Sequence, residues 1–177
     1  MVIYGIVGRP GARLGSAKST LLTWLALTYQ AKFDQKIVAN YHINIKNFQF
    51  LENPRELLNL FNSFIAIDDI YRWLGFDNSR AKKLSKLMAG EIRHHSNNMA
   101  WVSSRLKEYA HKALRDHTDY FLFPLFSKAT GWVTIDVLNA EGESVPGVIP
   151  RTIAPAIVRK VWTFYNHRED IKVTDYF

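Results

Sequence analysis

Residues 8–20 contain the residue types that bind phosphate. Their sequence, GRPGARLGSAKST, follows a short apolar run and precedes a stretch of helix-forming residues. Backbone N–H groups at the start of a helix favour anions, and glycines let a chain approach them closely. A lysine adds positive charge beside terminal phosphates, and a serine or threonine hydroxyl binds Mg²⁺. We therefore expect Lys18 to bind phosphate and Ser19 to bind metal, with Thr20 as a substitute for Ser19.

The spacing differs from the usual phosphate-loop pattern, G-x-x-x-x-G-K-[ST]. Ala17 precedes the lysine, where glycine is usual, and Gly11 lies one residue too far upstream. Alanine fits there at negative φ, whereas a left-handed conformation would cost about 1 kcal/mol or more. The alternative is a glycine-rich turn with a surface lysine. The predicted nucleotide-binding residues are Gly11, Gly15, Ser16, Ala17, Lys18, Ser19 and Thr20.

Two carboxylates follow another apolar run. Residues 64–67 are Phe-Ile-Ala-Ile, and Asp68 and Asp69 come directly after them. An ATPase with a phosphate loop needs one carboxylate that helps hold Mg²⁺ and a neighbour that polarises the attacking water. We assign the first role to Asp68 and the second to Asp69, where glutamate is more usual. The alternative is a pair of aspartates that caps the next helix.

Apolar runs and helical patterns alternate along the 177 residues. The predicted strands are residues 2–7, 36–41, 63–67, 99–102, 120–126 and 132–138. The predicted helices are residues 17–32, 54–62, 79–92, 106–115 and 154–165. This alternation predicts an α/β fold with a mostly parallel central sheet flanked by helices, ending in a small hairpin and a closing helix. No repeat or linker divides the chain, so we expect one domain over residues 1–177.

Composition excludes several classes of protein. With 47% apolar and 14% aromatic residues, the chain can bury a core and is not a disordered tail. The absence of cysteine excludes disulfides, thiolate metal sites and a cysteine nucleophile. No apolar run approaches the roughly 20 residues that cross a bilayer, and no secretory signal is evident. We therefore expect a cytoplasmic protein without a membrane span.

Positive charge is concentrated in one part of the chain. The formal net charge is +7, and residues 71–118 contain ten basic and four acidic residues. Such a block favours a polyanionic partner, above all nucleic acid. The alternative is a solvated basic helix surface. The five tryptophans are dispersed, and we expect them to pack in the core, with Trp73 as the exception beside the basic helix.

Several short motifs together resemble a known family. They are Asp68-Asp69, Asn78-Ser79-Arg80, Arg93-His94, residues 99–104 (MAWVSS) and residues 114–119 (LRDHTD), with further similarity in residues 8–11, 36–41 and 161–166. In order and spacing they resemble the FtsK–HerA superfamily of DNA-pumping ATPases. They are most similar to its zonula-occludens-toxin-like and archaeal-viral packaging members. The resemblance covers most of the chain.

The resemblance implies a RecA-like P-loop NTPase fold, MgATP hydrolysis and assembly into a ring. It implies catalytic roles for Lys18 and Asp69, and a polar sensor at Ser104. Arg105 stands where the family has glutamine. It also implies an arginine that reaches a neighbouring subunit's nucleotide, for which Arg80 and Arg93 are the candidates and Arg80 is preferred.

The combined prediction is an ATP-driven motor that translocates double-stranded DNA during genome packaging of a virus or mobile element. It would form a homo-oligomeric ring, with a hexamer favoured, in the cytoplasm (the host's, for a virus), with a capsid or portal component as a further candidate partner. One alternative is a small P-loop kinase. Another is a nucleotide- or DNA-binding subunit with little turnover, which Ala17, Asp69 and Arg105 favour. The residues predicted to contact DNA phosphates are Lys82, Lys83 and Lys86.

Overall fold

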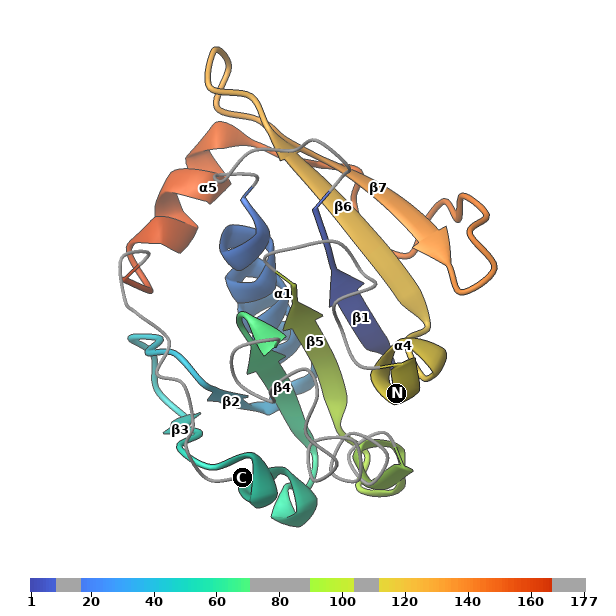
Figure 1. Ribbon diagram of the computed structural model, residues 1–177. Coiled ribbons are helices and arrows are strands. Elements are labelled where there is room, and N and C mark those ends of the chain that lie inside the picture. Colours follow the sequence, from blue (N-terminus) through green and yellow to red (C-terminus); the bar gives the residue numbers. More distant parts are fainter. Residues whose placement is uncertain (9–16, 71–89, 104–111, 167–177) are drawn as a thin grey trace.

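A computed structural model describes residues 1–8, 17–70, 90–103 and 112–166. Within these ranges, the strands are β1 (Ile3–Ile6), β2 (Lys36–Ala39), β3 (Phe48–Phe50), β4 (Ser63–Ile67), β5 (Asn98–Val102), β6 (Tyr120–Phe126), β7 (Val133–Asn139) and β8 (Thr152–Ile153). They form one sheet in the order β3-β2-β4-β5-β1-β6-β7-β8 (Figure 1). Neighbours from β3 to β6 are parallel, and β7 and β8 are antiparallel additions. The predicted α/β class and mostly parallel sheet are confirmed.

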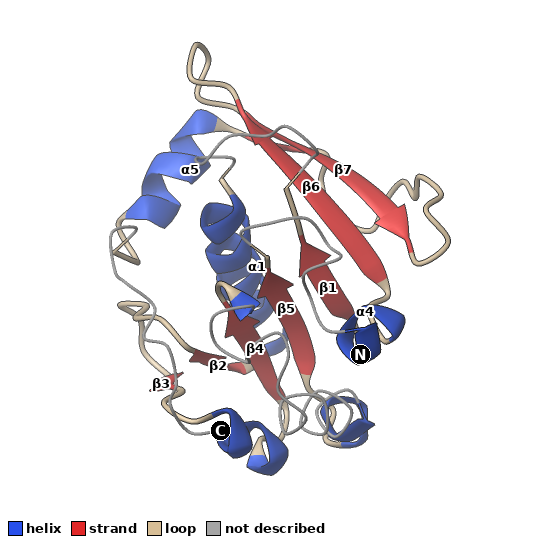
Figure 2. Cartoon of the chain, viewed as in Figure 1, coloured by secondary structure: helices blue, strands red, loops and turns tan. Residues whose placement is uncertain are grey.

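Helices cover both faces of the sheet (Figure 2). Among the described residues they include α1 (Lys18–Phe33), the 3₁₀ helix η1 (Pro54–Asn59), α4 (Lys112–Asp116) and α5 (Pro155–Trp162). Apolar residues of α1 and α5 pack on one face, and those of η1 and α4 pack on the other. None of these helices has the length and apolar character needed to cross a bilayer. The predicted helix at 54–62 is shorter and tighter than expected, and most of the predicted helix at 79–92 lies outside the described residues.

The central strands are apolar on both faces because helices cover both. All four residues of β1 are buried, as are all five of β4. Gly5 lies where β1 passes the fully buried Trp101 of β5, and a Cβ on Gly5 would lie 2.6 Å from Cζ2 of that tryptophan. The glycine thus allows the indole to pack directly against the β1 backbone.

Two tryptophans contradict the expectation of core packing. Trp101 is fully buried, but Trp132 is 42% exposed and Trp162 is 41% exposed. Trp132 directly precedes β7, and Trp162 is the last residue of α5. Both lie at the ends of elements, where packing on the sheet is incomplete, and dispersed spacing in the sequence could not distinguish these positions from the core.

The topology brings the chemical groups to one edge of the sheet. In parallel strands the carboxyl ends share an edge, so the residues after β1, β2 and β4 lie together. Helix α1 begins at this same edge. Strand β5 separates β1 from β4, which places the phosphate-loop strand and the acidic strand about 10 Å apart.

Candidate nucleotide site

The predicted metal ligands meet at the carboxyl edge of the sheet. Ser19 is the second residue of α1, and Asp68 directly follows β4. The Ser19 hydroxyl donates a hydrogen bond of 2.6 Å to Oδ2 of Asp68. Oδ1 of Asp68 accepts a bond of 2.9 Å from the backbone N–H of Asp69. Both oxygens of the carboxylate are therefore oriented, and one of them faces the first turn of α1.

A buried asparagine holds the backbone of Asp68. Asn40 directly follows β2 and is 5% exposed. Its Nδ2 donates to the carbonyl of Asp68 and its Oδ1 accepts from the N–H of Asp68, each at 2.8 Å. These bonds continue the β2–β4 pairing beyond its last register pair, Ala39 and Ala66. Asn40 was not predicted as a site residue, although a polar residue directly after an apolar strand was the available signal.

Lys18 is the first residue of α1 and faces the end of β1. A Cβ on Gly8 would lie 3.9 Å from the Lys18 ammonium nitrogen. Burial lowers the pKa of Lys18, while the carboxylates of Asp68 and Asp69 act in the opposite direction. Burial likewise raises the pKa of Asp68, against the Ser19 hydrogen bond and the nearby ammonium. The site thus contains an ammonium group and a carboxylate that are both partly withdrawn from water.

Ala17 does not have the negative φ at which alanine fits without strain. It is the N-cap of α1 with φ 62° and ψ 26°, a left-handed conformation. Glycine adopts this region freely, whereas in alanine the Cβ comes too close to the backbone and the conformation is strained. Asp69 is also left-handed, at φ 43°, which aspartate tolerates better than most residues. The turn between β1 and α1 therefore requires a left-handed conformation at position 17, which explains why glycine is usual there.

Replacing Ala17 with glycine is expected to stabilise the protein by about 1 kcal/mol, because the left-handed strain disappears. For a chain of this size the melting temperature should rise by about 2–4 °C, which calorimetry measures. Ala154→Gly is the matched control, since Ala154 is also a helix N-cap but has φ −67°. It should give no gain, and an equal gain in both variants would contradict the assignment of strain to Ala17.

Thr20 lies one residue beyond Ser19 but has different partners. It is 4% exposed. Its hydroxyl accepts a hydrogen bond of 3.0 Å from Trp162 Nε1 and shares a second, of 2.9 Å, with the Tyr165 hydroxyl. The side chain thus connects α1 to the end of α5. This arrangement favours Ser19 over Thr20 as the metal ligand.

Arg93 lies at the amino edge of the sheet, opposite the site. Its Nη2 donates 2.8 Å to Oδ1 of Asp119 and 3.0 Å to the carbonyl of His117. Asp119 Oδ2 in turn accepts from the N–H of Ile3, at 2.8 Å. These contacts give Arg93 a structural role at the start of β1 and β6.

The remaining predicted site residues lie outside the described parts of the chain. They are Gly11, Gly15, Ser16, Arg80, Lys82, Lys83, Lys86 and Ser104. Ser103, which directly follows β5 and precedes Ser104, is fully buried, and its N–H donates a hydrogen bond of 3.0 Å to the carbonyl of Ile6. Ser103 therefore lies at the same edge of the sheet as Lys18 and Asp68.

Comparison of three-dimensional structures identifies proteins with this fold. The N-terminal domain of zonular occludens toxin from Neisseria meningitidis is similar with a TM-score of 0.54 at 13% identity, over 93% of this chain and 98% of that one. The genome packaging NTPase B204 from Sulfolobus turreted icosahedral virus 2, in complex with AMP, gives 0.58 at 9% identity, over 84% and 98%.

A KaiC-like protein from Pyrococcus horikoshii OT3 gives a TM-score of 0.50 at 9% identity, over 78% of this chain and 77% of that one. By sequence, neither a protein-family model nor a curated protein matches the chain. The fold implied by the resemblance is confirmed: the chain has the P-loop NTPase fold of the zonular occludens toxin domain and the viral packaging NTPase.

Proposed function

We propose that this chain binds MgATP at the start of α1 and hydrolyses it to drive the movement of double-stranded DNA. The observation that carries the proposal is the 2.6 Å hydrogen bond between Ser19 and Asp68. This hydrogen bond joins the first turn of α1 to the carboxylate that follows β4, and Lys18 lies beside both groups. A P-loop triphosphatase requires these three groups at one place.

The donors at this place fit Mg²⁺. Hydroxyl and carboxylate oxygens are the hard ligands that this ion prefers. Ser19 and Asp68 would hold the ion, which neutralises charge on the phosphate oxygens. Lys18 would place its ammonium group on the β- and γ-phosphates, and Asp69 would orient and polarise the attacking water. Asn40 keeps the Asp68 backbone in position throughout.

The motor function rests on the charge pattern and on the fold. A translocating protein must grip any sequence, and contacts to phosphates meet this need. The proposed contacts are Lys82, Lys83 and Lys86, within the basic block. We further propose a homo-oligomeric ring, with a hexamer favoured, in which Arg80 acts on the neighbouring nucleotide and Ser104 senses its terminal phosphate. The similar fold of a genome packaging NTPase supports this reading.

ATP hydrolysis by the purified chain, with and without double-stranded DNA, tests the proposal. We expect magnesium-dependent release of phosphate that DNA stimulates, and a loss of about a hundredfold in Asp69→Asn. ADP that forms only after a hydroxyl acceptor is added would instead identify a kinase. Equal background rates in wild type and Asp69→Asn would remove the enzymatic function and leave a binding subunit.

A further inference from the structure

We propose that Trp162 is the stacking platform for the nucleobase of the bound nucleotide. This inference rests on the proposed nucleotide site and adds the part of the ligand that the phosphate loop does not recognise. The sequence pattern assigned Trp162 to the core, but the residue is 41% exposed. An exposed aromatic side chain beside a phosphate site is a surface on which a purine can stack.

The indole is fixed to the helix that begins at the phosphate site. Trp162 Nε1 donates 3.0 Å to the hydroxyl of Thr20. Thr20 directly follows Lys18 and Ser19, in the first turn of α1. Since its N–H is already bonded, the ring has a set orientation, and little side-chain freedom remains to be lost when a ligand stacks.

The Thr20 hydroxyl is hydrogen-bonded to one member of each of two aromatic pairs. On one side Tyr165 contacts Tyr41, with ring centroids 6.2 Å apart. On the other side Trp162 contacts Phe126, with ring centroids 5.9 Å apart at 64°. Phe126 ends β6, whereas Tyr41 follows β2. The two pairs therefore point toward opposite ends of the sheet.

Strand order gives the direction of the nucleoside. In the order β4-β5-β1-β6, strand β6 lies about 14 Å from β4 across the sheet. Strand β6 also continues beyond its last register pair with β1, Ile6 and Leu122, as far as Phe126. Ser19 and Asp68 mark the metal and the terminal phosphates on the β4 side. A triphosphate that extends from there across the start of α1 carries its base toward β1 and β6, where Phe126 and Trp162 form a T-shaped ring pair.

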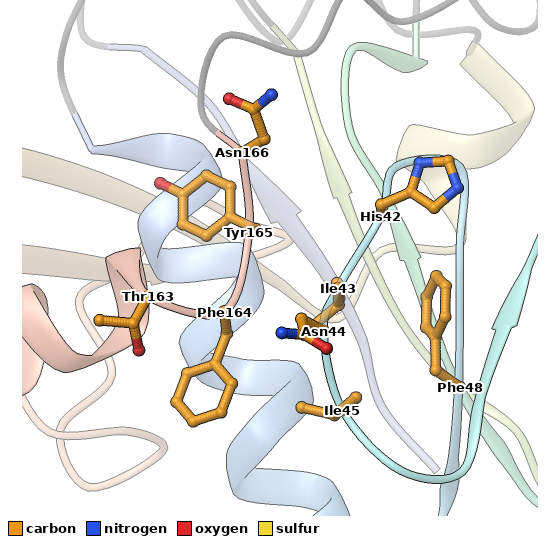
Figure 3. Close-up of a pocket in the computed structure, with 9 residues that line it drawn as sticks. All are labelled: His42, Ile43, Asn44, Ile45, Phe48, Thr163, Phe164, Tyr165 and Asn166. Carbon is orange, nitrogen blue, oxygen red and sulfur yellow. The ribbon is translucent and has the colours of Figure 1, made fainter.

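The alternative position for a base is a cavity of about 620 Å³ (Figure 3). It is lined by His42, Asn44, Phe48, Phe164 and Asn166, among others. Its volume is within the range of ligand pockets. However, the segment from His42 to Phe48 connects β2 to β3, and these strands lie beyond β4. This cavity is therefore on the terminal-phosphate side, away from the direction in which the nucleoside extends.

The test compares two magnesium-bound ligands, ATP and inorganic triphosphate, by titration calorimetry on the full chain. In Trp162→Ala we expect the affinity for ATP to fall about tenfold or more, as loss of one stacked base predicts. The affinity for triphosphate should be unchanged. Trp162→Phe, which keeps a ring but not the N–H, should retain most of the affinity for ATP. Trp132→Ala is the matched control, because Trp132 is 42% exposed and should change neither ligand.

Several results would overturn the proposal. Equal losses for both ligands in Trp162→Ala would show that the indole acts through Thr20 on the phosphate site. Unchanged affinity for ATP in Trp162→Ala would show that the base does not stack on Trp162. A loss of affinity for ATP but not for triphosphate in Phe48→Ala would place the base in the cavity. If wild type binds triphosphate and ATP equally, no base site exists. If wild type binds neither, the proposed function itself fails.

Discussion

Lys18→Met is expected to reduce magnesium-dependent ATP hydrolysis by about a hundredfold or more. Removal of one preorganised charge from a transition state that develops negative charge costs this much in comparable sites. Methionine keeps the apolar stem of the side chain but removes the ammonium group that lies near Gly8 and is held beside Asp68 and Asp69. The measurement is phosphate release at saturating MgATP, together with ATP affinity by calorimetry.

The control for Lys18 is on the same helix. Lys32 lies in the last turn of α1, is exposed, and is remote from the carboxyl edge of the sheet. Lys32→Met should leave both rate and affinity within about twofold, since it touches no part of the site. A Lys18→Met rate within about threefold of wild type would contradict the assignment of this ammonium to the phosphates.

The sequence predicted the parts of the site that are local. The turn before Lys18 and Ser19 and the apolar strand before Asp68 each carry a complete signal within a few residues. The sheet then brings Ser19 and Asp68 together, as two parallel strands with carboxyl ends on one edge require. Local motifs are sufficient to predict this contact because, in a parallel sheet, the carboxyl ends of the strands lie at the same edge.

What the sequence could not predict depends on register and packing. Asn40 reaches Asp68 across 28 residues, and only the pairing of β2 with β4 reveals that contact. The short strand β3 was missed because three partly exposed residues carry no alternation. Thr20 looked equivalent to Ser19 along the chain, yet helical rotation turns its hydroxyl toward α5. Likewise, the left-handed φ of Ala17 is a property of the turn and not of the residue.

Asp68→Asn is expected to lower hydrolysis by about a hundredfold and to raise the magnesium concentration needed for half-maximal activity. The amide is isosteric, so Oδ1 can still accept the N–H of Asp69, and the other end of the side chain can still contact Ser19. Only the negative charge that favours a divalent cation is lost. The measurement is the rate as a function of Mg²⁺ concentration. An unchanged magnesium requirement would contradict the metal role of Asp68.

Alanine variants of two asparagines can distinguish an effect on the position of Asp68 from an effect on the stability of its strand, β4. Asn40 forms two hydrogen bonds with the backbone of Asp68, directly after β4. Asn97 likewise bonds the backbone at the start of β4, where it accepts 2.8 Å from the N–H of Ser63 and donates 2.7 Å to the carbonyl of Leu60. Replacing either with alanine leaves buried backbone groups unpaired, at a cost of about 1–3 kcal/mol in unfolding free energy.

The two alanine variants should therefore lose similar stability but differ in activity. Asn40→Ala frees the Asp68 peptide, so we expect a higher magnesium requirement and a rate about tenfold lower at physiological Mg²⁺. Asn97→Ala lies at the amino edge, remote from Ser19, and should keep the wild-type magnesium curve. If both variants shift the curve equally, the effect belongs to the strand as a whole, and Asn40 has no specific part in holding the carboxylate.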